Sequence, residues 1–508
     1  MLLRLQTGGT TVGLVTTPES PASRSRYPRI GAMSIEEFRA HLASIAPEVP
    51  CDNEILPRDR SPLGAPLEIL GVRASNRFAI QPMEGWDGTE DGRPTELTFR
   101  RWRRFGESGA KLIWGCEAAA VRFDARANPN QLVIAESTLE SLESLRGALI
   151  EGHRNRFGSS EDLVVGLQLT HSGRFSRPHR KDQPEPRAAF RHPILDARVG
   201  LTRDDQLLTD GELDGLIVDF VSAAKHARDL GFAFVDIKHC HGYLLHELLG
   251  AHTRPGRYGG SFENRTRALR DIVGGIRRNA KGIELGVRLS IFDMAPFRPD
   301  PTASKPGAPG PGVLEDLSLA TPYRYGFGVR EDRPDELDLT EGRRLLRLLE
   351  DLGVTLVNLS AGSPYYNPHI QRPALYPPSD GYSPPEDPLM GVVRQLRAAR
   401  DLKRSFPGLA IVGSALSYLQ DFLPHVAQGL VREGWMDFVG LGRMVLSYHD
   451  LPADVLEHGR MDRKRICRTF SDCTTAPRNG LVSGCYPLDK HYAALADGAK
   501  LREIKLRG

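Results

Sequence analysis

Short apolar runs alternate with helical patterns along most of the chain, and this alternation is the strongest structural signal in the sequence. The apolar runs have the length and composition of buried strands. Between them, apolar residues recur three or four positions apart, as they do on the buried face of a helix. The expected strands cover residues 77–82, 111–117, 163–168, 233–238, 284–290, 354–359, 409–413 and 436–441.

The clearest helix start is a capping box formed by Thr209 and Glu212, which precedes apolar residues on one face, among them Leu213, Leu216 and Phe220. A second helix is expected to begin at Thr340. Further helices are expected over residues 34–46, 95–107, 138–150, 261–279, 389–404, 419–433 and 451–459.

Eight apolar strands that alternate with helices predict an α/β fold with a parallel sheet covered by helices. Eight such units that close on themselves form a TIM (β/α)8 barrel. The alternative is an open, doubly wound sheet, which is disfavoured because no Gly-x-Gly-x-x-Gly opens a helix after an early strand.

We expect three parts: an N-terminal extension (1–60), partly disordered at its start, the barrel (61–465), and a short C-terminal tail (466–508). Two Gly/Pro-rich stretches, 298–336 and 363–388, should form long loops at the functional end of the barrel. The first cannot continue a helix or strand and is a candidate lid.

The charge balance excludes several classes of partner. The chain of 508 residues has 67 basic and 64 acidic side chains, so nothing indicates a nucleic acid or an anionic membrane as partner. Six cysteines in so long a chain do not form a disulfide framework, and no apolar run reaches the length of a membrane span or a signal peptide core. We therefore expect a cytoplasmic protein that acts on a small molecule, with assembly into a homo-oligomer left open.

A dense polar cluster follows the fourth expected strand. In barrels of this kind the active site lies at the carboxyl ends of the strands. A polar surface loop is the alternative, but the chain becomes apolar again at Leu244, so the cluster should lie between buried segments. Its members are Lys238, His239, His241 and Tyr243.

The seventh and eighth expected strands end in Gly413-Ser414 and Gly442-Arg443. Glycine lets backbone N–H groups approach a phosphate, and arginine supplies a fixed positive fork. Ordinary turns use the same residues, but barrels often hold phosphate after these two strands, and the agreement of both favours a phosphate site.

The segment from His241 to Leu249, followed by Y-G-G-S-F-E-N-R at 258–265, resembles the signature of the Old Yellow Enzyme family of FMN-dependent oxidoreductases. The resemblance covers roughly residues 65 to 460. It implies FMN at the mouth of the barrel, with its phosphate near Gly413, Ser414, Gly442 and Arg443, and NADH or NADPH as a diffusible reductant.

The resemblance also implies the contacts of the flavin ring. Backbone after Pro82-Met83 would meet the ring, and the Gln168 amide would reach its pyrimidine edge. Arg288 would face N1 and O2 and stabilise negative charge there. The matching positions are Pro82, Met83, Glu84, Ala118, Gln168 and Arg288.

By the same resemblance, Tyr243 is the proton donor, and two residues three positions apart bind the activating group of the substrate. These residues are Lys238 and His241, where the family has His/His or His/Asn, so Lys238 is a departure. Glu84 is a second departure, because a small polar residue or cysteine is more usual there. We expect Glu84 and Lys238 to form an ion pair across the flavin that changes substrate preference. His239, Cys240 and His246 are expected to have structural roles.

The tail contains Cys467, Cys473 and Cys485. Longer members of the family, resembling dienoyl-CoA reductase and trimethylamine dehydrogenase, carry four cysteines here for an iron–sulfur cluster. The second cysteine is missing, with Phe470 near its place. We therefore expect a relic that packs without metal rather than an iron–sulfur cluster.

The expected function is NAD(P)H-dependent hydride transfer to an activated C=C bond or related electrophile. Two alternatives stay open: an amine dehydrogenase or demethylase, and a flavin-binding barrel without turnover.

Overall fold

The computed structural model describes residues 26–507, and its centre is a closed barrel of parallel strands. The first strand of the barrel, β3, pairs with the last, β13, and β4 pairs with β6. These pairings close the barrel. All eight expected strands are present, so the prediction of a TIM (β/α)8 barrel is confirmed. They are β3 (Phe78–Ile80), β4 (Leu112–Ile113), β6 (Val164–Thr170), β7 (Phe234–Ile237), β8 (Glu284–Ser290), β11 (Leu356–Ser360), β12 (Ala410–Gly413) and β13 (Phe438–Leu441).

The strand register sets polar residues side by side inside the barrel. Gln168 on β6 lies opposite Asp236 on β7, and Arg288 on β8 lies opposite Asn358 on β11. A short strand, β5 (Ala118–Ala120), adds to β6 at the same level, with Ala118 opposite Gln168. Because the strands are parallel, these residues come together near their carboxyl ends.

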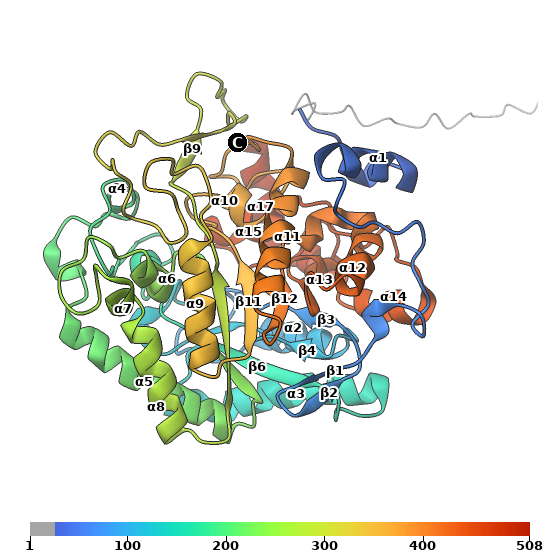
Figure 1. Ribbon diagram of the computed structural model, residues 1–508, viewed down its shortest axis with the longest axis horizontal. Coiled ribbons are helices and arrows are strands. Elements are labelled where there is room, and N and C mark those ends of the chain that lie inside the picture. Colours follow the sequence, from blue (N-terminus) through green and yellow to red (C-terminus); the bar gives the residue numbers. More distant parts are fainter. Residues whose placement is uncertain (1–25, 508) are drawn as a thin grey trace, which may run out of the picture.

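Helices surround the barrel on its outside (Figure 1). The expected capping box at Thr209 is present: its side chain accepts from the Glu212 backbone N–H and starts α5. The barrel helices are α2 (Glu96–Gly106), α3 (Leu139–Phe157), α4 (Leu195–Val199), α5 (Asp210–Asp229), α6 (Leu244–Leu249), α7 (Phe262–Arg265), α8 (Arg267–Asn279), α9 (Thr340–Asp351), α11 (Pro388–Ser405), α12 (Leu423–Arg432), α13 (Met444–Ser447) and α14 (Leu451–His458).

Helix boundaries differ from the expected ones in three places. Helix α3 continues past residue 150 to Gly158, whose left-handed φ of 82° ends it. The segment expected as one helix over 261–279 breaks at Thr266, and the one expected over 419–433 begins as a 3-10 helix, Leu416–Phe422. A helix end at a glycine and a break of one residue change the spacing of apolar residues very little, so the sequence pattern does not reveal them.

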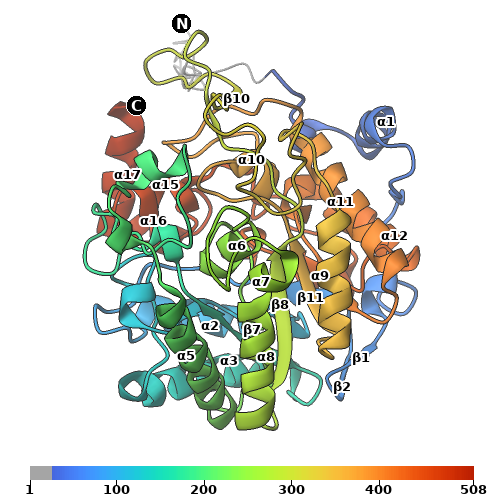
Figure 2. The same ribbon diagram turned by 60° about the vertical axis from the view of Figure 1, so that its left-hand side comes forward.

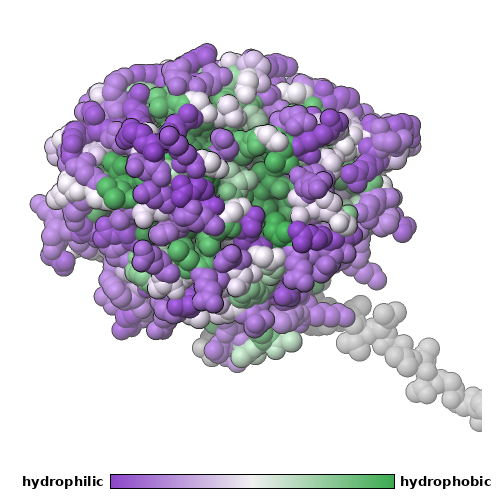
Figure 3. Space-filling model, turned by 90° about the horizontal axis from the view of Figure 1, so that it is seen from below, coloured by the Kyte–Doolittle hydropathy of each residue, from purple (hydrophilic) through white to green (hydrophobic). Residues whose placement is uncertain are grey.

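The lower end of the barrel is closed by a hairpin that the periodicity does not reveal, β1 (Leu67–Ile69) and β2 (Val72–Ala74). Ile69 and Ala74 pack with Trp114 and Phe234 in a buried cluster under the strands. Seen from below, polar side chains dominate this end, and the apolar ones lie in separate groups (Figure 3).

The upper end carries the long loops and the tail (Figures 1 and 2). The stretch 298–336, expected to be a long loop, also contains a short antiparallel ladder of β9 (Phe297–Pro299) and β10 (Gly312–Leu314) between its Pro/Gly turns. The second long loop contains α10 (Pro368–Gln371). The tail forms α15 (Asp472–Arg478), α16 (Lys490–Ala494) and α17 (Ala496–Arg507).

The N-terminal extension packs on the outside through α1 (Ile35–Ile45), which begins with a capping box at Ser34. Phe38 stacks on Phe422 with ring centroids 4.1 Å apart. The expected disorder at the start of this extension falls on residues 1–25, outside the described residues. Within residues 26–507, no helix has both the length and the apolar composition that crossing a lipid bilayer requires.

Candidate active site

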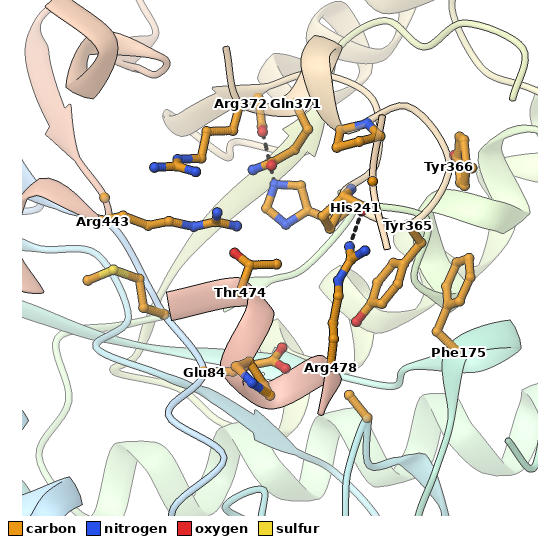
Figure 4. A pocket seen from close by; sticks show the side chains of 18 of the residues that line it. Glu84, Phe175, His241, Tyr365, Tyr366, Gln371, Arg372, Arg443, Thr474 and Arg478 are labelled. Carbon is orange, nitrogen blue, oxygen red and sulfur yellow. Dashed lines mark hydrogen bonds between the residues drawn. The ribbon is translucent and has the colours of Figure 1, made fainter. Parts of the chain in front are cut away.

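A cavity of about 610 Å³ opens at the upper end of the barrel. Its walls come from strand ends, from the two long loops and from the tail (Figure 4). Of the residues expected at the site, the lining includes Pro82, Met83, Glu84, Gln168, Lys238, His241, Tyr243, Arg288, Ser414, Gly442 and Arg443. Ala118 and Gly413 lie behind this surface in buried strand positions.

The turn after β7 aims three side chains into this cavity. His241 and Gly242 both have left-handed backbone, with φ of 67° and 79°. A Cβ atom at Gly242 would approach Phe175, Ser363 and Tyr366 to 3.0 Å, so the close packing requires glycine. His241 and Gly242 reverse the direction of the chain between Lys238 and Tyr243. The side chains of Lys238 and Tyr243 therefore line the same cavity as that of His241.

Lys238 forms the expected ion pair with Glu84. The Nζ atom lies 3.0 Å from Glu84 Oε1, and the side chains are 5% and 13% exposed. The same ammonium lies 3.7 Å from the centroid of the Tyr243 ring, close enough for a cation–π contact. Lys238 is therefore held by a carboxylate and an aromatic face together.

The hydroxyl of Tyr243 is at the centre of a hydrogen-bond network. It lies 3.1 Å from both Glu84 carboxylate oxygens and 3.1 Å from the Tyr365 hydroxyl. Burial, and then the Glu84 charge, raise the pKa of Tyr243 well above its ordinary value. The phenol therefore keeps its proton at neutral pH.

His241 is fixed by hydrogen bonds to serine side chains. Its Nε2 lies 3.0 Å from Ser360 Oγ, its backbone N–H donates to Ser290 Oγ, and its carbonyl accepts from Ser363 Oγ. Burial, and then the charges of Arg288 and Lys238, hold the pKa of His241 well below its ordinary value. The imidazole is therefore neutral at neutral pH.

The floor of the cavity is polar. Asp236 accepts hydrogen bonds from Gln168 Nε2 at 2.6 Å and Trp114 Nε1 at 2.7 Å. Because Asp236 fixes the NH₂ end of the Gln168 amide, its carbonyl end is left for a ligand. Arg288 is buried beside this pair, and its Nε has no hydrogen-bond partner among the described residues.

The ends of β12 and β13 form the opposite side. Ser414 Oγ accepts from Gln81 Nε2 at 3.1 Å, which orders the turn after β12. A Cβ atom at Gly442 would meet only the Gln81 Cβ at 4.0 Å, so the backbone there is open to the cavity. No hydrogen bond or ion pair of the Arg443 guanidinium is found within residues 26–507, and burial, then the Arg372 charge, lower its pKa to about 10.

These features fit FMN. Two guanidinium groups, those of Arg288 at the floor and Arg443 beside the Gly442 backbone, need hydrogen-bond acceptors. The described residues do not supply these acceptors. A flavin ring has acceptors on its pyrimidine edge, and its phosphate is an anion with several oxygens. Gln168, Arg288, Ser414, Gly442 and Arg443 are the residues that would hold these groups.

Several cavity residues had no sequence signal. Trp86 donates to Glu84 Oε2 at 3.4 Å, and Phe175 stacks on Tyr365 with centroids 4.1 Å apart. Arg372 comes from the second long loop and Arg478 from tail helix α15. These residues lie in loops or in a segment distant in sequence, where neither periodicity nor the family motifs mark them.

The residues expected to have structural roles lie outside the cavity lining. His239 Nδ1 is 2.8 Å from the Ile237 carbonyl, and His246 Nδ1 accepts from the Gly242 N–H at 2.8 Å. Burial lowers the pKa of His239 to about 4 and that of His246 to about 3. Cys240 is buried beside them, and burial raises its pKa to about 11.

The three tail cysteines are free thiols. Across residues 26–507, no three His, Cys, Asp or Glu side chains are placed to share a metal ion. Phe470, near the place of the missing cysteine, stacks on Tyr376 of the second long loop with centroids 5.9 Å apart. The segment therefore packs against the second long loop through an aromatic contact.

Comparison with known proteins agrees with this geometry. Residues 62–302 match the NADH:flavin oxidoreductase / NADH oxidase family. The chain is 29% identical over 291 residues to an NADPH dehydrogenase of Geobacillus sp. (strain WCH70), which covers 55% of this chain and 73% of that protein.

Two solved structures show the same fold. An old yellow enzyme homologue from Zymomonas mobilis has a TM-score of 0.53 at 20% identity, over 79% of this chain and 94% of that one. A 2-naphthoyl-CoA reductase has a TM-score of 0.60 at 19% identity, over 85% of this chain, which spans only 57% of the reductase. Together, the family match over residues 62–302, the sequence relative and the shared fold make this chain similar to proteins of the NADH:flavin oxidoreductase / NADH oxidase family, with a barrel like that of the old yellow enzyme homologue.

Proposed function

We propose that this flavin oxidoreductase uses NADH or NADPH to reduce an electron-poor C=C bond conjugated to a carbonyl or a similar activating group. The observation that carries the proposal is that Tyr243, Lys238 and His241, from the turn after β7, line the same cavity as Gln168 and Arg288. A proton donor and two hydrogen-bond donors are what such a reduction needs.

Gln168, Arg288 and Arg443 would hold the FMN, which would supply hydride-transfer chemistry between NAD(P)H and the electron-poor carbon of the substrate. Tyr243 then supplies a proton to the neighbouring carbon: its O–H bond breaks and a C–H bond forms. The phenolate that remains lies beside the Lys238 ammonium, 3.7 Å from the ring centroid, and the Tyr365 hydroxyl. Solvent returns the proton, so the sum is one NAD(P)H and one proton for each saturated bond.

The activating group would be bound by His241 and Lys238. With Ser360 as donor to Nε2, the proton of the neutral imidazole is on Nδ1, which can then donate to a carbonyl oxygen. Lys238 adds a full positive charge near the same place, which stabilises negative charge that develops on that oxygen. Glu84 offsets this charge when the cavity is empty of substrate.

The contacts of Lys238 disfavour an amine substrate. A carboxylate and an aromatic face are the groups that recognise an organic ammonium ion. Here both already hold the protein's own ammonium, which is 5% exposed. An amine would have to displace Lys238 from this position, so the reductase is the better supported function.

Anaerobic mixing of the FMN-loaded protein with NADH and NADPH tests the proposal. Bleaching of the oxidised flavin by either coenzyme, followed by recovery of its absorbance on addition of 2-cyclohexenone or maleimide, is the expected result. Bleaching by histamine or trimethylamine but by neither coenzyme would establish an amine dehydrogenase. A flavin that neither donor reduces would make the protein a binding module.

The alkene-reducing step should show little pH dependence from His241 or Tyr243 between about pH 5.5 and 8. The pKa of His241 lies well below its ordinary value, so the ring stays neutral, and the pKa of Tyr243 is raised, so the phenol stays protonated. Single-turnover oxidation of the reduced enzyme by 2-cyclohexenone across this range measures it. A step in rate near pH 6.5 that disappears in His241→Asn would contradict the neutral imidazole.

A further inference from the structure

Three arginines from separate parts of the chain converge at one side of the cavity. Arg443 follows β13, Arg372 follows α10 in the second long loop, and Arg478 ends α15 in the tail. They also border a smaller recess that adjoins the cavity. In Figure 4, Arg372 and Arg443 lie next to each other, with Thr474 facing the same space.

Several hydrogen-bond donors around this space have no acceptor among the described residues. Arg372 Nε and Nη2 are buried and have no partner within residues 26–507, and the same holds for Thr474 Oγ1. Arg372 Nη1 alone is satisfied, by Ser471 Oγ at 3.0 Å. Buried guanidinium donors without acceptors are costly, so this arrangement indicates a ligand with several oxygen acceptors.

The local charge indicates the class of ligand. Arg478 pairs with Asp380, whereas no carboxylate in the described part of the chain pairs with Arg372 or Arg443. Two unpaired guanidinium groups therefore leave a charge of +2. A phosphate monoester carries about −1.5 to −2 at pH 7 and has three acceptor oxygens, and arginine forks match this geometry.

We propose that Arg372 and Thr474, together with Arg443, form a phosphate-monoester site that extends beyond the ends of β12 and β13. Two of its three residues, Arg372 and Thr474, come from outside the strand ends of the barrel. The tail orients it, because Ser471 accepts from Arg372 and donates to the Tyr376 carbonyl at 2.6 Å, which ties the loop to the tail. The ligand is the phosphate of FMN or the 2′-phosphate of NADPH, which are both phosphate monoesters.

This inference rests on the flavin of the proposed function, and riboflavin separates the two. Apoprotein is titrated with FMN and with riboflavin, and quenching of flavin fluorescence gives each Kd. In Arg372→Gln, the Kd for FMN should rise about 10- to 100-fold, because a charge-assisted contact is lost, while the Kd for riboflavin stays unchanged. Thr474→Val, which keeps the side-chain shape, should show the same selectivity with a smaller effect.

Arg298→Gln is the matched control. Arg298 lines the same cavity but is already paired with Glu315 at 3.1 Å. Its replacement should leave the ratio of the two Kd values as in the native protein. The melting temperature of the Arg372→Gln apoprotein should stay the same or rise, because a buried charge with two unsatisfied donors is removed, and this checks that the variant folds.

The coenzyme is the second source of a phosphate. If Arg372→Gln leaves both flavin Kd values unchanged but raises the Kd for NADPH, and not that for NADH, in anaerobic reduction of the flavin, the site belongs to the 2′-phosphate of the coenzyme. If FMN, riboflavin and both coenzymes bind as in the native protein, the proposal is wrong, while the reductase function stands. A native protein that binds neither flavin would instead overturn the proposed function.

Discussion

Replacing Tyr243 with phenylalanine should slow alkene reduction by about 10²- to 10⁴-fold, the usual contribution of a positioned general acid. Reduction of the flavin by NADH or NADPH should be unchanged, because that step needs no proton from the phenol. The ring remains, so the Lys238 cation–π contact and the packing against Tyr365 are kept. Stopped-flow measurement of the two half-reactions separates these effects.

Tyr365→Phe is the control for this prediction. It removes one of the hydrogen bonds to the Tyr243 hydroxyl, the one at 3.1 Å, but leaves the proton donor itself. We expect a loss of about 10-fold or less in alkene reduction, the value of one hydrogen bond. Equal losses in both variants would assign the proton to Tyr365, and no loss in Tyr243→Phe would remove Tyr243 from the reaction.

The barrel was predictable because its strands are buried on both sides. Strands such as β7 and β8 appear in the sequence as short apolar runs, and parallel sheets covered by helices require such runs. The hairpin of β1 and β2 was not predictable. Each of its strands has three residues, of which only one is buried, Ile69 in β1 and Ala74 in β2. One buried residue in three does not produce the alternating apolar pattern that predicts a strand.

The strand-end part of the site was predictable for a related reason. Residues such as Gln168, Arg288 and Lys238 follow or end apolar runs, so their place at the mouth of the barrel follows from the strand assignment. Tyr365, Arg372 and Thr474 belong to a long loop and a tail helix. Their approach to the cavity depends on tertiary packing between segments about one hundred residues apart, which no local pattern records.

The tail has a clearer role in the structure than in the sequence. In the sequence, the spacing of its cysteines is its most distinctive feature. In the structure, however, other residues of the tail make its contacts with the cavity. Ser471 orients Arg372, Thr474 faces the cavity, and Arg478 donates to the Pro364 carbonyl of the second long loop. The tail therefore forms a wall of the cavity and contacts the loop that carries Tyr365.

Breaking the ion pair between Glu84 and Lys238 from one side should destabilise the apoprotein by about 3 to 5 kcal/mol, because the other charge is left buried and unpaired. Glu84→Gln leaves the ammonium and Lys238→Met leaves the carboxylate, and both side chains are largely inaccessible, at 13% and 5% exposure. Thermal and denaturant unfolding of the two single variants measure the loss.

The double variant Glu84→Gln/Lys238→Met completes the cycle. With both charges gone, no unpaired charge remains, and the stability should return to within about 1 kcal/mol of the native protein, because replacing a whole buried pair is often neutral. The exposed pair of Arg180 and Asp182 is the control, since Arg180→Gln should leave the melting temperature unchanged. Additive losses in the double variant would show that the two charges do not interact, and the role of Glu84 in holding Lys238 beside Tyr243 would then be wrong.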